Sequence, residues 1–245
     1  MNKISIFICA HQPFDDSVFP ANDMYKIVTY NRNMKSDNHE VIYFDTVKGR
    51  LLSEINHLLW IYHNIDNIDA DYICVCHYRR FLKTYMNNEN KLIEDIDKHK
   101  FVTSTSWPLI KDKTVLDNLR RHFYDYCVDD VFLPSLNEVS NKHAYLKQHI
   151  SEMLESDFRI YNNIFACAKE DYIEIMKVVE DFSNVMCEKM NIHSDEEMDE
   201  NIRRNIVPQN CRRFVAHMSE VVVQLYLGHY NKTTHYENLL KLCDD

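Results

Sequence analysis

A short apolar run that ends in a cluster of polar side chains is the feature that most constrains the fold. The run from Tyr72 to Cys76 has the length of a strand and is apolar at successive positions, as in strands buried on both faces of a parallel sheet. His77, Tyr78, Arg79 and Arg80 follow it directly. Because parallel sheets bind ligands at the carboxyl ends of their strands, this cluster is expected to lie at a binding edge.

The two adjacent arginines of this cluster indicate an anion. Guanidinium groups are costly to bury at a strand exit unless they meet a negative charge, and phosphate is the anion that best matches the fork of an arginine. The alternative is that Arg79 and Arg80 are solvated surface charges. His77 also has two interpretations, because an imidazole at this position either acts on a ligand or is a core histidine.

Strand-like and helix-like segments alternate along the chain. Strands are expected at residues 3–10, 39–44, 72–76, 101–105 and 160–168. Helices are expected at residues 22–34, 51–65, 114–127, 135–154, 172–190 and 209–227, the last of them ended by Gly228. Residues 193–205 are expected to form a loop or a frayed helix. The alternation predicts an α/β sheet flanked by helices, with a helical C-terminal part.

Composition excludes several classes of protein. A net charge of −10 argues against nonspecific nucleic-acid binding. Gly49 and Gly228 are the only glycines, so a nucleotide site here cannot use a glycine-rich dinucleotide turn or P-loop. We expect no membrane span, since no apolar run approaches ~20 residues, and no signal peptide. The eight scattered cysteines indicate reduced thiols, and together these features predict a cytoplasmic protein.

Five segments of the chain resemble a known family. Cys76-His77-Tyr78-Arg79-Arg80-Phe81 resembles the hallmark of a glycosyltransferase-like family common in bacterial capsular and exopolysaccharide clusters, domain of unknown function family 4422. Four other segments are similar to the family in the same order, at residues 6–14, 53–60, 163–170 and 216–220. The chain departs from the family pattern at Gln12, Ala216 and Val221, where Lys, Gly and Arg are usual.

The resemblance implies a fold, an activity and a set of site residues. It implies one nucleotide-sugar-binding, GT-A-like domain over residues 1–245, and a glycosyltransferase that moves a sugar from a nucleotide-sugar donor to a capsular or cell-surface glycan, free or lipid-linked. Peripheral association with the inner face of the membrane is compatible with this activity. The expected donor-binding residues are His11, Tyr78, Arg79 and Arg80. The expected sugar- or acceptor-binding residues are Glu54, Asn56, Asn163 and His217. The expected catalytic residues are Glu220 and His77.

Three of these residues have alternative roles. Glu220 is the expected general base, because a carboxylate within an apolar helical run is costly unless it is paired or functional. The alternative is a structural ion pair with a nearby cation such as Arg212 or Arg213. Glu54 is expected beside the buried face of its helix, where the alternative is a solvated glutamate favoured by the helix dipole. Asn163 either contacts a sugar hydroxyl or belongs to a turn.

A metal requirement is left open by the sequence. Many nucleotide-sugar enzymes hold a divalent cation with an Asp-x-Asp pair that follows the central strand. Here Asp69 and Asp71 precede that strand, so we expect them in a turn away from the site. The arginines would then replace Mg²⁺ or Mn²⁺ as the counter-charge of the diphosphate, with His77 as the remaining candidate metal ligand. The rival hypothesis is a non-catalytic glycan- or nucleotide-binding module with the same fold.

Overall fold

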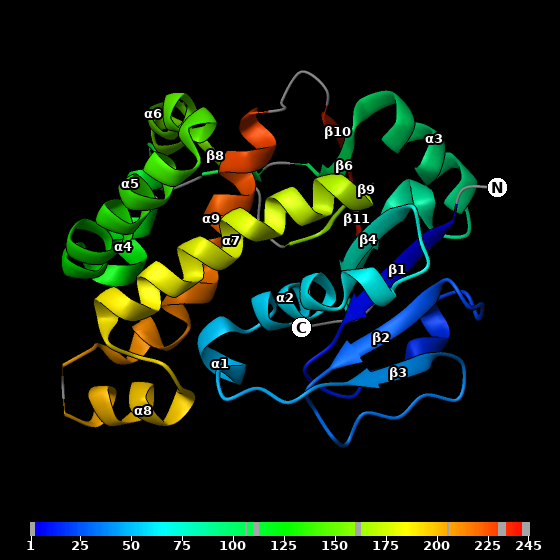
Figure 1. Cartoon of the computed structure of the whole chain (residues 1–245), viewed down its shortest axis with the longest axis horizontal. Coiled ribbons are helices and arrows are strands. Elements are labelled where there is room, and N and C mark those ends of the chain that lie inside the picture. The colour runs from blue at the N-terminus through cyan, green and yellow to red at the C-terminus, as the bar shows by residue number, and fades with distance from the viewer. Residues whose placement is uncertain are drawn as a thin grey trace.

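A mixed sheet flanked by helices forms the centre of the protein (Figure 1). The computed structural model describes residues 3–105, 107–109, 113–159, 163–204, 206–229 and 234–241. The strands are β1 (Ile4–Cys9), β2 (Tyr25–Thr29), β3 (Glu40–Tyr43), β4 (Tyr72–His77), β5 (Arg80–Leu82), β6 (Phe101–Ser104), β7 (Trp107–Pro108), β8 (Phe158–Arg159), β9 (Phe165–Ala168), β10 (Thr234–Glu237) and β11 (Leu239–Lys241). The helices are α1 (Gly49–Leu52), α2 (Ile55–His63), α3 (Glu89–His99), α4 (Val115–Tyr126), α5 (Leu133–Lys142), α6 (Ile150–Glu155), α7 (Lys169–Met190), α8 (Asp195–Arg203) and α9 (Phe214–His229).

The order of strands in the main sheet collects several strand ends at one edge. The order is β10-β6-β9-β4-β1-β2-β3, with β5 paired to β4 and β11 paired to β5, while β7 and β8 pair separately. β1 runs parallel to β2 and β4, and β9 runs antiparallel to β4 and β6. The carboxyl ends of β1, β2, β4 and β6 therefore share an edge with the amino end of β9. We call it the carboxyl edge; in Figure 1 the arrowheads of β2 and β3 point from the sheet toward α1.

The two faces of the sheet are covered by different helices. Alternate residues of β1 point to opposite faces, as the pleat of a strand requires. Ile6 and Ile8 pack on the face covered by α3, whereas Phe7 packs with α2, α7 and α9 on the other face. The expected α/β sheet flanked by helices is confirmed, as is the helical C-terminal part. Among the helices of the described ranges, none has the length and apolar character needed to cross a membrane.

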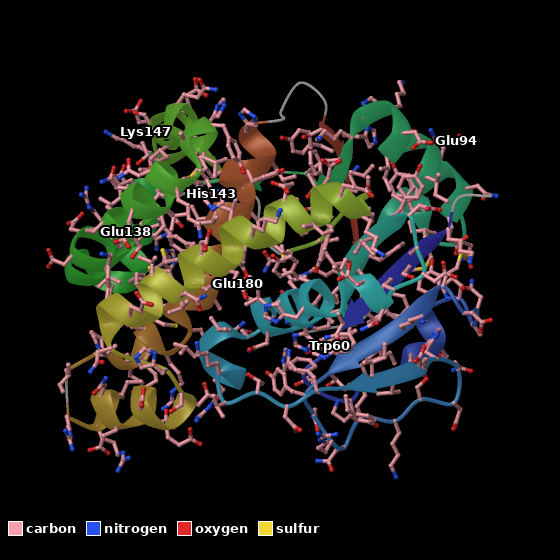
Figure 2. All side chains as sticks on the ribbon, in the orientation of Figure 1. Trp60, Glu94, Glu138, His143, Lys147 and Glu180 are labelled. Atoms are coloured by element: carbon pink, nitrogen blue, oxygen red, sulfur yellow. The ribbon has the colours of Figure 1, made fainter. Side chains whose placement is uncertain are left out.

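Charged contacts on the outer surface join the helices of this second face (Figure 2). Glu138 of α5 lies 2.8 Å from the Lys189 amine of α7. His143, which directly follows α5, lies 2.7 Å from an Asp181 carboxylate oxygen of α7. His63 of α2 lies 2.5 Å from Glu180 of α7. Most of these side chains are partly exposed, so the apolar packing beneath them supplies most of the attachment.

One predicted helix is a strand, and another is broken. Residues 22–34 were predicted to be helical, but they contain β2, whose hydrogen bonds to β1 and β3 override the local apolar spacing. The predicted helix over residues 51–65 is divided into α1 and α2 at Ser53, which has a φ of 46°. A side chain rarely adopts this region, because Cβ approaches the backbone too closely.

Other boundaries also differ from those predicted. The segment predicted as helical at 135–154 is divided between α5 and α6, and a 3₁₀ turn precedes α9. Gly228 lies inside α9 and does not end it. Residues 193–205 contain α8, whose first turn is capped by Ser194 accepting from the Glu197 amide at 3.1 Å. The strand predicted at 160–168 is β9, and residues 160–162 lie outside the described ranges. α3, β10 and β11 were not predicted.

Candidate functional site

The polar cluster after the central strand forms a tight hairpin at the carboxyl edge. His77 is the last residue of β4 and pairs with Arg80, the first residue of β5. Tyr78 and Arg79 are therefore the two turn residues. The Arg79 guanidinium carbon lies 5.3 Å from the centre of the Tyr78 ring, a distance at which a cation is attracted by the face of an aromatic ring. The turn thus fixes the Arg79 side chain beside the strand end.

His77 is held by contacts to both of its ring nitrogens. Its Nδ1 accepts a hydrogen bond from the backbone N–H of Arg79 at 3.2 Å. A backbone N–H can only donate, so Nδ1 carries no proton and the neutral ring has its proton on Nε2. Nε2 lies 3.0 Å from Glu54 Oε1, although its N–H is not aligned with that oxygen. His77 Nε2 is therefore close to the Glu54 carboxylate without an aligned hydrogen bond to it.

Glu54 is a covered carboxylate and not the solvated glutamate of the alternative interpretation. It directly precedes α2, and only 18% of its side chain is exposed. Burial by itself would raise its pKa, but the contact with His77 and the charges of His57 and Arg213 outweigh burial and lower the pKa of Glu54 to about 2. Glu54 is thus ionised at neutral pH, and His77 holds it at the carboxyl edge.

His11 joins this cluster from the end of β1. Its Nε2 lies 3.4 Å from the Tyr78 hydroxyl, and its ring centre lies 5.2 Å from that of Tyr78 and 6.1 Å from that of His77. Burial lowers the pKa of His11, and His77, Arg213 and Arg79 lower it further. The structure therefore brings together the predicted residues His11, Glu54, His77, Tyr78 and Arg79.

The two predicted asparagines differ in their contacts. The Asn56 side chain accepts from the Thr46 hydroxyl at 3.0 Å and donates to the Lys48 carbonyl at 2.7 Å. Its amide thus connects α2 to the segment before α1, and we leave it out of the site. Asn163 lies just before β9, at the same edge as the end of β4. Its side chain is buried, with the residue 5% exposed, and neither amide atom has a hydrogen-bond partner among the described residues. Buried amides are rarely left without partners.

Glu220 and His217 lie together on α9. Glu220 Oε2 is 4.0 Å from His217 Nδ1, and 15% of the Glu220 side chain is exposed. The two arginines named as examples of a structural partner for Glu220 have other contacts. Arg212 contacts an Asp199 carboxylate oxygen at 2.9 Å, and Arg213 contacts Ser53.

Ser53 and Arg213 were not predicted as parts of the site. Arg213 Nη2 donates to the Ser53 hydroxyl at 2.7 Å, and Ser53 has the positive φ described above. Strained backbone of this kind costs about 1–3 kcal/mol and often occurs at functional sites. The Arg212-Arg213 pair was visible in the sequence, but nothing in it indicated that Arg213 meets a residue 160 positions earlier.

Most of the chain matches one protein family. Residues 5–232 match the family described as "Domain of unknown function (DUF4422)". The chain belongs to the DUF4422 family. No curated protein matches this DUF4422 chain.

A solved structure shares the fold of this DUF4422 chain. It is described as the apo structure of WbbM, a bifunctional glycosyltransferase, and it aligns with a TM-score of 0.72 at 14% sequence identity. The alignment covers 99% of this chain and 46% of the other chain, so the chain spans less than half the length of that protein. At this identity the comparison establishes a glycosyltransferase-like fold and nothing finer.

Among the residues that the structure describes, the side chains of this DUF4422 chain do not fit a divalent-cation site. Asp69 and Asp71 lie at the amino end of β4, where Lys3 forms an ion pair with Asp69 and donates its backbone N–H to Asp71 at 2.8 Å. Within the described ranges, no three His, Cys, Asp or Glu side chains are grouped so that they could hold a metal ion. His77 Nδ1 accepts from the Arg79 amide, and its Nε2 lies 3.0 Å from Glu54. We therefore derive no step through a metal.

A separate cavity of about 820 Å³ opens at the amino edge of the sheet, away from this cluster. It is lined in part by Ser5, Lys26, Glu40 and Trp60 (Trp60 is labelled in Figure 2). Lys26 and Glu40 form an ion pair of 3.0 Å across neighbouring strands. Since ligands of α/β sheets bind at the carboxyl ends of parallel strands, we place the functional site at the carboxyl edge despite the size of this cavity.

Acid is expected to destabilise the protein in two steps. His57 donates its Nε2–H to the Ala10 carbonyl at 3.2 Å, and burial lowers the pKa of His57 to about 4 from 6.5. The unfolded histidine binds a proton that the folded one excludes, so stability falls as the pH drops from 6.5 toward 4. The ionised Glu54, with its pKa lowered from 4.5 to about 2, adds a second loss as the pH falls through that lower interval.

Melting temperatures measured from pH 8 to pH 3 would check this prediction. His57→Gln keeps an N–H donor for Ala10 but does not titrate, so the variant should lose the decline between pH 6.5 and 4 and keep the decline at lower pH. A decline of the same size in both proteins would assign the first step to other groups.

Proposed function

We propose that this chain is a glycosyltransferase that moves a sugar from a nucleotide-sugar donor to a growing capsular or cell-surface glycan, free or lipid-linked. One observation carries the proposal. An arginine, two histidines, a tyrosine and an ionised carboxylate meet at the carboxyl edge of a glycosyltransferase-like fold. This edge is where α/β sheets bind ligands. The cytoplasmic setting expected from the reduced thiols is part of the same proposal.

The donor diphosphate would lie against Arg79 and Arg80, with His11 and Tyr78 next to the nucleotide. Guanidinium groups form charge-assisted hydrogen bonds to phosphate oxygens. In this proposal they take the place of a metal ion as counter-charge. Support comes from the described donor set, which offers cations at this edge and holds the nearest Asp-x-Asp pair at the opposite end of β4.

The sugar would be held by Glu54 and Asn163. An ionised carboxylate accepts hydrogen bonds from hydroxyl groups, and an amide both donates and accepts. The buried amide of Asn163 gains partners when a hydroxyl group fills its position. His77 was expected to be catalytic; its Nδ1 accepts from the Arg79 amide and its Nε2 lies 3.0 Å from Glu54. We therefore propose that His77 positions Glu54.

The acceptor would lie toward α9, next to His217 and Glu220. The acceptor hydroxyl oxygen forms a new bond to the anomeric carbon, the bond from that carbon to the diphosphate oxygen breaks, and the nucleoside diphosphate leaves with the electron pair. In an inverting reaction a base must take the hydroxyl proton, and Glu220 is the proposed base. Its position 4.0 Å from His217 supports a shared polar patch on an otherwise apolar helix.

The rival is a non-catalytic module that binds a glycan or a nucleotide. The position of Asp69 and Asp71 at the wrong end of the strand favours it. Release of nucleoside diphosphate from a nucleotide sugar separates the two hypotheses. An enzyme releases it with acceptor present and, more slowly, by hydrolysis without acceptor, whereas a binding module releases none.

Nucleoside diphosphates are expected to raise the melting temperature of the protein. A ligand at about 100 times its dissociation constant adds roughly 2.7 kcal/mol to the free energy of unfolding, which is on the order of 5–10 °C for a chain of this size. The measurement is a thermal-shift screen of uridine, guanosine, cytidine and thymidine diphosphates and their sugar conjugates. The matching nucleosides without phosphate are the control. If no diphosphate shifts the melting temperature more than its nucleoside does, the proposed donor site is wrong.

A further inference from the structure

Arg213 reaches the carboxyl edge from the helical C-terminal part. It ends the 3₁₀ turn Gln209–Arg213 and directly precedes α9. α1 contacts both this turn and α9, which brings Arg213 next to Ser53, the residue between α1 and Glu54. The 2.7 Å bond from Arg213 Nη2 to the Ser53 hydroxyl fixes one end of the guanidinium group.

A short row of contacts connects Arg213 to Arg79. Ser53 is followed by Glu54, the Glu54 carboxylate lies 3.0 Å from His77 Nε2, and His77 Nδ1 accepts from the Arg79 amide at 3.2 Å. Both guanidinium groups also act on the same imidazole, since each lowers the pKa of His11. Arg79 and Arg213 therefore lie at the two ends of this row of contacts, and the charges of both act on His11.

Arg213 has no carboxylate within ion-pair distance among the described residues, although its charge acts on Glu54 from farther away. Its neighbour Arg212 differs, because Arg212 lies 2.9 Å from Asp199. Arg213 is exposed, and its bond to a neutral hydroxyl uses one of the five N–H donors of a guanidinium group. Its charge and its remaining donors are thus available to an anion, in a chain whose net charge is −10.

We propose that Arg213 is a further cation of the donor-diphosphate site, in addition to Arg79 and Arg80, at the opposite end of the row formed by Ser53, Glu54 and His77. This inference rests on the proposed function and adds one consequence. The diphosphate site is complete only when the turn before α9 is packed against α1. The positive φ of Ser53 fits this role, because that conformation directs its hydroxyl to Arg213 while Glu54 turns toward His77.

Arg213→Ala tests the inference, with Arg212→Ala as the matched control. The probe is the nucleoside diphosphate with the largest thermal shift, and its affinity is measured by titration calorimetry. A hydrogen bond to a charged group contributes about 1.5–3 kcal/mol, so Arg213→Ala should weaken binding by about 10- to 100-fold. Arg212→Ala should bind as the wild type does, because Arg212 is paired with Asp199. Arg79→Ala should lose affinity to an extent similar to Arg213→Ala.

Ser53→Ala separates anion binding from a structural role of Arg213. This variant removes the same hydrogen bond but keeps the cation, so it should lose clearly less diphosphate affinity than Arg213→Ala does. Equal losses for Ser53→Ala and Arg213→Ala would overturn the inference, because Arg213 would then act only through Ser53.

Two further results distinguish this inference from the proposed function. If the wild type binds and Arg79→Ala does not, yet Arg213→Ala binds normally, the inference alone is wrong. If the wild type binds no nucleoside diphosphate, the proposed function itself fails.

Should Arg213→Ala not fold, Arg213→Gln keeps N–H donors without the charge. Its diphosphate affinity should be lower than that of the wild type and less sensitive to salt, since salt screens only the charged contact; an unchanged salt dependence would count against the inference.

Discussion

Replacing Glu220 with glutamine is expected to lower the turnover of sugar transfer by about 10²- to 10⁴-fold, the usual effect of losing a general base. Glutamine keeps the shape and the hydrogen-bonding capacity of the side chain but cannot take a proton. The affinity for the nucleoside diphosphate should stay unchanged, because Glu220 lies on α9 next to His217 and is assigned to the acceptor side. Turnover with a nucleotide sugar and acceptor, and diphosphate affinity measured separately, would show this division.

A matched control for this variant is Glu188→Gln, at an exposed carboxylate near the end of α7. It should leave turnover and affinity unchanged. Circular dichroism and melting temperature would establish that Glu220→Gln is folded. Turnover near the wild-type rate would exclude Glu220 as the base. A variant that does not fold would assign Glu220 to the packing of α9, where its polar contacts would be structural.

The carboxyl edge could be predicted from the sequence because the residues of its central part are contiguous in the chain. The apolar residues of β4 and the polar residues after it are contiguous, so strand and site follow from one stretch of chain. β2 was missed for the opposite reason. Its apolar residues Tyr25, Ile27 and Val28 fit either a helix or a strand when read alone, and their pairing with β1 and β3 decides between the two.

The rest of the site depends on packing that no local pattern specifies. The break at Ser53 needs a positive φ at a residue that does not favour it. Without that break, Glu54 would lie in the first turn of one helix, as the apolar spacing of residues 51–65 predicts. With the break, Glu54 precedes α2 and reaches His77. Arg213 joins the same row only because the turn before α9 packs against α1.

Removing the contact between His77 and Glu54 is therefore also expected to have a large effect, in this case on the stability of the fold. His77→Phe keeps the volume of a ring but removes the Nε2 proton that faces Glu54 and the Nδ1 acceptor of the Arg79 amide. A buried charge that loses its partner destabilises a protein by about 3 kcal/mol or more. For a chain of this length that lowers the melting temperature by roughly 6–12 °C. The pKa of Glu54 should rise at the same time, because burial would then act with less opposition.

Two measurements would test whether this loss comes from the pair itself. Denaturant unfolding of the wild type, His77→Phe, Glu54→Gln and the double variant forms a thermodynamic cycle. If His77 stabilises the Glu54 carboxylate, the double variant should lose clearly less stability than the sum of the two single variants. The exposed Lys3–Asp69 pair is the control, since Asp69→Asn removes a charge pair at the surface, where such pairs contribute little. An additive cycle, or a Glu54 pKa that NMR titration finds unchanged in His77→Phe, would mean that His77 does not hold the carboxylate and that its part in the site must be found elsewhere.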